Sequence, residues 1–178
     1  HSVWVREKGR GEYDQDGHLL WVSGFIWDIS DRKAVEDQLR LSQQRFSSAF
    51  STAPQGMALV SLQGHWLEVN DELCRMLGYS REELLAIDFQ QITHPDDLFI
   101  DQTFVAQMLA GERPHYTLEK RYLRKNGDVL WITLTVALVR DLKGEPDYFI
   151  SIIEDNQQRK ETEEALRRNE VMVPVTPI

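Results

Sequence analysis

The sequence has little cysteine, no long apolar run and no excess of positive charge, and each shortage argues against a class of protein. Its one cysteine, Cys74, cannot form an internal disulfide, which fits a reducing compartment. No apolar stretch approaches the roughly 18 residues needed to cross a bilayer, and no signal peptide is visible. We therefore expect a cytoplasmic fragment without membrane contact of its own, and a membrane anchor elsewhere in the parent protein stays compatible with it.

The charge of the chain argues against a nucleic-acid partner. Its 178 residues carry a net charge of -9. Proteins that bind nucleic acid gain affinity by releasing counterions through basic patches, which an acidic chain lacks. With 42% hydrophobic residues, the length suits one well-filled core plus additional segments.

The sequence also lacks the patterns that would support catalysis or metal binding. It has no glycine-rich phosphate loop and no Ser/His/Asp or Cys/His arrangement at a supporting spacing. Its carboxylate pairs, Glu82-Glu83 and Asp96-Asp97, fall where helices are expected to begin, and negative charge is favourable there. No histidine is spaced as one of a pair of metal ligands along a helix. We expect no enzyme and no metal site.

The last third of the chain repeats its opening. When residues 4–40 are aligned with residues 131–167 at a constant shift of 127, ten positions carry the same residue. These pairs are Trp4/Trp131, Asp14/Asp141, Gly17/Gly144, Ile26/Ile153, Asp28/Asp155, Arg32/Arg159, Lys33/Lys160, Glu36/Glu163, Leu39/Leu166 and Arg40/Arg167. A shift this long indicates two tandem copies of a whole domain, of which one is complete here.

Each copy ends by passing from an aromatic-rich hairpin into a charged helix. Residues 3–29 contain two β-prone runs around a turn at 14–17, and helix is expected from Ser30 to about Phe50 and again over 157–170. Both helices carry a short heptad seam along one side, whose apolar members are Val35, Leu39, Phe46 and Leu166. Two interpretations stay open: an amphipathic linker that covers its own domain, or a weak and adjustable homodimer seam.

The sequence pattern of the complete module between these helices predicts an α+β domain. Two strands at 55–69 are followed by helices beginning after Asn70, at the Ser80 capping box and at Pro95, and then by three strands over 115–154. Such an order predicts a five-stranded antiparallel sheet with helices on one face, flanked by amphipathic linker helices. In the central strand, alternation places Leu130, Ile132, Leu134, Val136 and Leu138 toward the core.

Residues 46–160 resemble a PAS domain with its C-terminal PAC motif. The resemblance rests on Asn70, the run from Gly78 to Leu84, His94-Pro95-Asp96-Asp97, Glu119-Lys120-Arg121, Lys125-Asn126-Gly127, Trp131, Asp155 and Arg159-Lys160. Residues 1–33 resemble the last two strands of another PAS domain.

The resemblance implies a division of the chain into five parts. Residues 1–29 would be the C-terminal hairpin of a preceding PAS/PAC domain, 30–50 a connecting helix, 51–156 the complete domain, 157–170 a C-terminal linker helix and 171–178 a tail. It also implies a signal junction at Asp28 in the first copy and at Asp155 and Gln157 in the second. The family has Ser or Thr where Gln157 stands, which weakens the expectation that the second junction transmits a signal.

The resemblance raises the question of a cofactor. Flavin-binding photosensors of the family need a reactive cysteine where this chain has Phe89, and haem-binding members need a histidine that residues 97–110 lack. We therefore expect neither a covalent flavin nor haem, whereas a non-covalent flavin or a small organic ligand stays open. The candidate pocket residues are Met57, Leu59, Val69, Leu73, Met76, Phe89, Ile92, Phe104, Met108, Leu118, Ile132, Leu134 and Val136.

The function implied is that of a sensory and signal-relay module in a multidomain bacterial signalling protein. The sequence of the module resembles domains that precede diguanylate cyclase or phosphodiesterase output domains. It resembles less closely the domains that precede histidine kinases. Any catalytic output domain would lie in the parent chain outside these residues. The alternative is a structural dimerisation scaffold that has no cofactor and senses no ligand.

Overall fold

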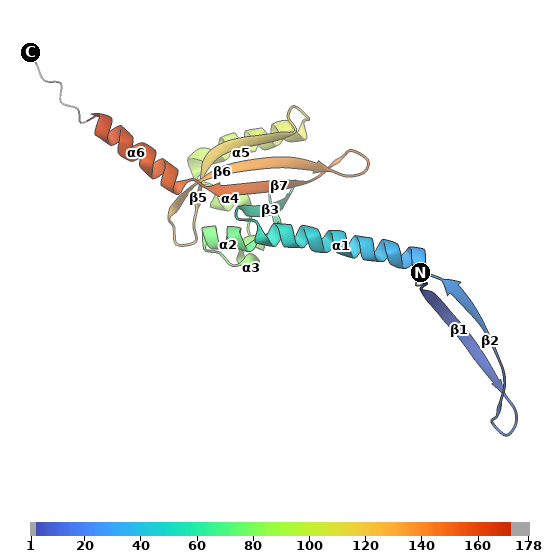
Figure 1. Ribbon diagram of the computed structural model, residues 1–178. Helices are drawn as coiled ribbons and strands as arrows, with labels where there is room; N and C mark the ends of the chain where they lie inside the picture. Colours follow the sequence, from blue (N-terminus) through green and yellow to red (C-terminus); the bar gives the residue numbers. More distant parts are fainter. Residues whose placement is uncertain (1–2, 172–178) are drawn as a thin grey trace, which may run out of the picture. The chain divides into compact units, whose positions relative to one another are not determined.

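The computed structural model describes residues 3–171 (Figure 1). Its contacts divide the chain into two units, of which the first ends at Ala49 and the second begins at Phe50. The expected tail falls almost wholly on residues 172–178, which lie outside the described residues. Within residues 3–171, none of the helices is both long and apolar enough to span a bilayer. The cytoplasmic location stays a prediction.

The first unit is a hairpin followed by most of a helix. Strands β1 (Val5–Tyr13) and β2 (Leu19–Asp28) pair in antiparallel fashion, and helix α1 (Ser30–Thr52) follows. The turn between the strands depends on Asp14, whose Oδ1 accepts hydrogen bonds from the amides of Asp16 (2.9 Å) and His18 (2.8 Å). Gly17 adopts a φ of 85°, a backbone conformation that favours glycine.

The aromatic side chains of this hairpin are not covered. An isolated two-stranded hairpin is marginally stable in water, so we predict that this one packs against another surface. Trp4, Trp21, Phe25 and Trp27 are between 46% and 71% exposed in this single chain, and the packing of the hairpin against another surface stays a prediction.

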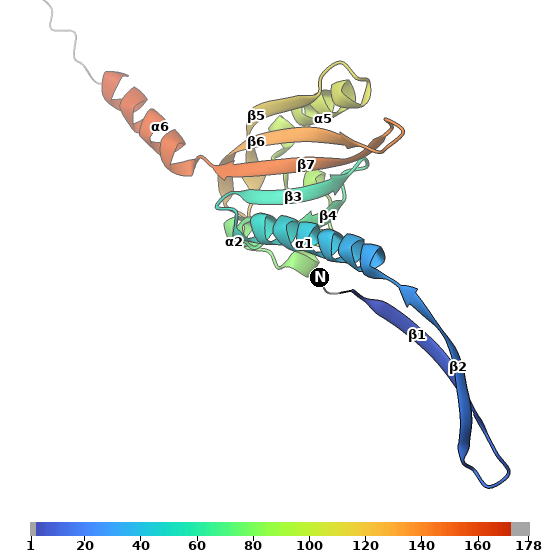
Figure 2. The same ribbon diagram turned by 45° about the vertical axis from the view of Figure 1, so that its right-hand side comes forward.

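The second unit contains a five-stranded antiparallel sheet in the order β4-β3-β7-β6-β5 (Figure 2). Its strands are β3 (Gly56–Ser61), β4 (Trp66–Val69), β5 (His115–Leu123), β6 (Val129–Arg140) and β7 (Pro146–Asp155). The first and last strands in sequence thus pair in the middle of the sheet, as β3 lies between β4 and β7.

Four helices lie between β4 and β5, and one follows β7. They are α2 (Asp71–Leu77), α3 (Arg81–Leu85), α4 (Phe89–Ile92), α5 (Pro95–Leu109) and α6 (Gln157–Val171). The expected caps are present: Asn70 accepts from the Leu73 amide, Ser80 forms a complete capping box with Glu83, and Gly78 ends α2 at a φ of 77°. The four-residue α4 was not predicted, since it carries no side-chain cap and is too short to show a period.

The core lies between the sheet and these helices. Leu130, Ile132, Leu134 and Val136 of β6 are at most 4% exposed, while the residues between them are half-buried. The predicted orientation of this strand, and with it the α+β fold class, is confirmed.

Candidate sensory core and helix junction

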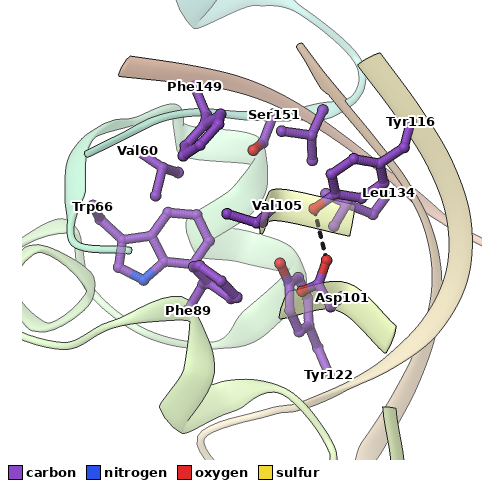
Figure 3. Close-up of a pocket in the computed structure, with 11 residues that line it drawn as sticks. Val60, Trp66, Phe89, Asp101, Val105, Tyr116, Tyr122, Leu134, Phe149 and Ser151 are labelled. Carbon is purple, nitrogen blue, oxygen red and sulfur yellow. Dashed lines mark hydrogen bonds between the residues drawn. The ribbon is translucent and has the colours of Figure 1, made fainter. Parts of the chain in front are cut away.

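A small cavity lies in the core between the sheet and helices α4 and α5 (Figure 3). Its volume is about 20 Å³. Its walls are formed by Val60, Trp66, Phe89, Asp101, Val105, Tyr116, Tyr122, Leu134, Val136, Phe149 and Ser151. This volume is enough for a water molecule and far less than an aromatic cofactor would need.

One end of the cavity contains a buried ion pair. The ammonium nitrogen of Lys120, on β5, lies 2.5 Å from Oδ2 of Asp101, on α5, and both residues are 0% exposed. Tyr116 donates a hydrogen bond of 2.7 Å to the other carboxylate oxygen of Asp101, as Figure 3 shows. Lys120 also donates to the Thr93 hydroxyl at 3.1 Å and lies 4.4 Å from the centre of the Tyr122 ring. The group therefore joins α5 to β5 inside the core.

Burial shifts the proton equilibria of this group. Desolvation lowers the pKa of Lys120, and the neighbouring Asp101 carboxylate opposes that shift. Burial, together with the charge of Asp101, raises the pKa of both Tyr116 and Tyr122 above the usual value, so both phenols stay protonated. Their hydroxyl groups can therefore donate hydrogen bonds at any physiological pH.

The structure places eleven of the thirteen predicted pocket residues in or around the core that contains the cavity. Phe89, Leu134 and Val136 line the cavity. A second group is buried in the core around it without lining it: Val69, Leu73, Met76, Ile92, Met108 and Ile132. Phe104 and Leu118 are partly buried and pack against that core. Contact of any of these residues with a ligand stays a prediction.

Met57 and Leu59 lie elsewhere. Side chains alternate along a strand, and Ala58 and Val60 are the residues of β3 that face the core. Met57 and Leu59 are half-buried on the opposite face of the sheet, away from the cavity.

Sequence reasoning missed the polar end of the cavity, although a signal was present. Lys120 lies in phase with Tyr116 and Tyr122 on β5, so alternation alone places this charge on the core face. A charge at such a position needs a buried partner. The sequence gives no comparable signal for its partner Asp101, because Asp101 lies 19 residues earlier, on the preceding helix α5.

The junction between β7 and α6 is held by hydrogen bonds to the backbone of Trp131 on β6. The Trp131 amide donates to Oε1 of Gln157 at 3.2 Å, and the Asn156 amide donates to the Trp131 carbonyl at 2.9 Å. Asp155 accepts from the Gln157 amide at 2.8 Å. Gln157 thus accepts a bond that a hydroxyl could accept, and the transmission of a signal through this junction stays a prediction.

Charged side chains reinforce the same junction. Glu119 of β5 pairs with Lys160 of α6 at 2.6 Å and also with Arg159. The Lys160 ammonium lies 5.1 Å from the centre of the Trp131 ring, within the range of a cation–π contact. The hydrogen bond from Lys160 to Glu119 raises the pKa of the Lys160 ammonium.

The first unit repeats this junction at the shift of 127 residues. The Trp4 amide donates to the Ser30 hydroxyl at 3.0 Å, and the Ile29 amide donates to the Trp4 carbonyl at 2.8 Å. Lys33 lies 5.9 Å from the centre of the Trp4 ring. Asp28 accepts from the Ser30 amide at 2.8 Å, which lowers the pKa of Asp28. The sequence repeat is therefore also a repeat of specific contacts.

The remaining candidates have ordinary structural roles. Cys74 is partly buried on α2 and packs against the core, and burial raises the pKa of its thiol. Asp14, Asp16 and His18 lie close enough to one another to hold an ion, but Asp14 already orders the turn. The seam residues Val35, Leu39, Phe46 and Leu166 are exposed.

The family model for the PAS fold matches residues 67–153 of this chain. The PAS domain of a protein from Colwellia psychrerythraea superposes with a TM-score of 0.59 at 22% identity, covering 65% of this chain and 96% of that one.

Two curated relatives are signalling proteins. The probable diguanylate cyclase DgcE of Escherichia coli (strain K12) is 44% identical over 135 residues, which are 76% of this chain and 12% of that protein. The sensor histidine kinase TmoS of Ectopseudomonas mendocina is 26% identical over 130 residues, 73% of this chain and 13% of that protein. The chain thus spans about an eighth of the length of these relatives. Sheet order, family model and relatives agree, and the second unit of this chain is a PAS domain homologous to domains of signalling proteins.

Proposed function

We propose that the second unit is the sensory and signal-relay module of a larger bacterial signalling protein. The PAS fold is a non-catalytic sensory fold and commonly occurs in multidomain, dimeric proteins, so the catalytic output would come from another domain of the parent protein. A diguanylate cyclase is favoured as that parent over a histidine kinase, because the identity is 44% against 26%.

The observation that supports a relay is the course of two strands from the cavity to the junction. Strand β6 contributes Leu134 and Val136 to the cavity and Trp131 to the junction. Strand β7 contributes Ser151 to the cavity and ends at Asp155, which caps the first turn of α6. A change in the cavity that shifts either strand would alter the bonds that hold α6, and a bias of a few kcal/mol would be enough to switch it.

The repeated junction supports two further parts of the proposal. Residues 1–29 would be the end of a preceding PAS domain, with residues 30–50 as the connecting helix and residues 51–156 as the domain that receives or passes on its signal. Because both junctions use the same contacts, the two domains would transmit by the same movement.

Dimerisation through the flanking helices is also part of the proposal. Val35 and Leu39 are exposed one helical turn apart on α1, and Leu166 is exposed at the equivalent position of α6. Apolar side chains at a heptad spacing would be covered by the same helix of a second copy.

A structural scaffold is the second candidate, and the small cavity favours it. A volume of about 20 Å³ leaves the core nearly filled, as a domain that only holds its neighbours in a dimer would require.

Hydrogen exchange distinguishes the two functions. Ser151→Val would fill part of the cavity from β7, and Thr135→Val is a matched change on the outer face of β6. If the domain relays, Ser151→Val changes the exchange rate of residues 157–168 by at least about threefold, and Thr135→Val does not.

Gln157→Ala tests the path of the relay. It removes the acceptor of the Trp131 amide, so we expect faster exchange of that amide by about fivefold and loss of the response of α6 to Ser151→Val. An α6 that exchanges at the same rate in all these variants would favour the scaffold.

A further inference from the structure

We infer that the cavity of the second unit is a binding site for a small, neutral molecule that carries a hydroxyl group. The inference rests on the proposed sensory function of the same cavity and specifies the class of ligand. Three properties of the walls lead to it: hydroxyl groups without partners, a charge that sums to zero, and a small apolar remainder.

The first property is unused hydrogen-bonding capacity. Ser151 is 6% exposed and Tyr122 is 1% exposed, both line the cavity, and none of the hydrogen bonds found within residues 3–171 involves either hydroxyl. The ring of Trp66 forms another part of the wall, and its indole nitrogen is buried without a partner on the edge of the ring that is turned away from Ser151 and Tyr122 (Figure 3). Figure 3 shows Ser151 and Tyr122 on different sides of the cavity, with the Asp101–Tyr116 bond between them. Buried polar groups are rarely left unsatisfied, so a guest that both donates and accepts hydrogen bonds fits this site.

The second property is charge. Lys120 and Asp101 sum to zero whether the proton lies on the amine or on the carboxylate. Lys120 already donates to Asp101 and Thr93, and each oxygen of Asp101 already accepts a bond, from Lys120 or from Tyr116. A charged guest would therefore be desolvated without a counter-charge of its own, which is strongly unfavourable.

The third property is size and polarity. The rest of the wall is apolar and includes Val60, Val105, Leu134, Val136 and Phe149. A volume of about 20 Å³ holds a water molecule and, with slight movement of these side chains, a guest of about two or three heavy atoms. A short alcohol has the required hydroxyl group, neutrality and apolar remainder.

The test compares three small probes on the whole chain. Methanol is the neutral hydroxyl compound, while methylammonium and formate are a cation and an anion of similar size, all used at equal ionic strength. The reporter is the indole N–H resonance of Trp66 in ¹⁵N-labelled protein, assigned with Trp66→Phe. We expect methanol to shift this resonance along a saturable curve, and the two ions to leave it in place.

Two variants test which hydroxyl groups bind the probe. Tyr122→Phe and Ser151→Ala each remove one hydroxyl from the wall, and each should weaken methanol binding about threefold to tenfold. Tyr148→Phe, a matched change on β7 outside the cavity, should leave the binding constant unchanged.

The outcomes separate this inference from the relay. Any of three results would overturn the ligand class. They are the absence of a saturable shift with methanol, equal shifts with the two ions, and the same methanol binding constant in Tyr122→Phe as in Tyr148→Phe. The three probes on the wild-type protein test the ligand class even where a variant does not fold. The exchange response of α6 to Ser151→Val is measured without any probe, so the relay can stand when the ligand class fails, and the reverse.

Discussion

Lys120 and Asp101 place two ionisable groups inside the core of the second unit. Both are 0% exposed, and the 2.5 Å contact between them is supported by hydrogen bonds from Tyr116 and to Thr93. A buried pair of this kind contributes little net stability compared with apolar residues of the same volume, because desolvation offsets the attraction. Its breakage is costly, because one charge is left without compensation. The pair thus fixes which part of α5 lies against β5.

Loss of Lys120 alone is therefore expected to destabilise the second unit strongly. Lys120→Met should lower the free energy of unfolding by about 3–5 kcal/mol, since it leaves the Asp101 carboxylate buried and unpaired. Adding Asp101→Leu should recover at least half of that loss. Urea denaturation of the single and double variants measures both effects as a mutant cycle.

A surface pair provides the control for this cycle. Lys125 and Glu83 are 2.6 Å apart but about half exposed, so Lys125→Met should cost less than about 1 kcal/mol. Additive losses in the buried double variant would show that the two groups do not depend on each other.

Asp97 attaches the start of helix α5 to β5 through three hydrogen bonds. Asp97 accepts hydrogen bonds from the Arg121 amide at 2.8 Å and from two nitrogens of its guanidinium, at 2.9 and 2.7 Å. Sequence reasoning gave Asp97 only the role of a negative charge at a helix start. The structure adds a second role, in which the residue joins a helix to a strand.

This contact makes part of the stability depend on acid pH. The hydrogen bonds from Arg121 lower the pKa of Asp97 from its usual value of 3.8. Because the folded-state pKa is the lower one, the contribution is fully present above that usual value and is lost as the pH falls through the folded value. Asp97→Asn should therefore cost about 1–2 kcal/mol at pH 7, and the difference from wild type should shrink toward pH 3.

Urea denaturation at the two pH values checks this prediction. Asp71→Asn is the control, because its carboxylate is 82% exposed and its removal should change stability by less than about 0.5 kcal/mol. A difference between Asp97→Asn and wild type that stays constant from pH 7 to pH 3 would contradict the assigned cause.

The whole molecule is expected to dimerise through one side of its flanking helices. Leu39→Asp would place a charge in the proposed seam of α1 and should raise the dimer dissociation constant at least about tenfold, since a desolvated charge replaces a buried leucine. Analytical ultracentrifugation over a range of concentrations measures that constant.

Leu41→Asp is a matched control on the same helix. Leu41 is also exposed, but two residues along a helix turn its side chain by about 200°, away from the seam. Equal effects of Leu39→Asp and Leu41→Asp would show that the dimer, if present, does not use this side of α1.

Local rules explain which features were predictable. The caps at Asn70 and Ser80, the end of α2 at Gly78 and the inward face of β6 each depend on neighbours within a few residues, so the sequence by itself determined them. The repeat at 127 residues likewise determined that Trp4 and Trp131 occupy equivalent junctions.

Only the tertiary structure decided what those elements enclose. The Lys120–Asp101 pair and the bond from Trp131 to Gln157 each join groups that are distant in the sequence. The hydroxyls of Ser151 and Tyr122, equally distant in the sequence, line one cavity. Their positions depend on how strands and helices pack and on how completely the side chains fill the core, neither of which a local pattern specifies.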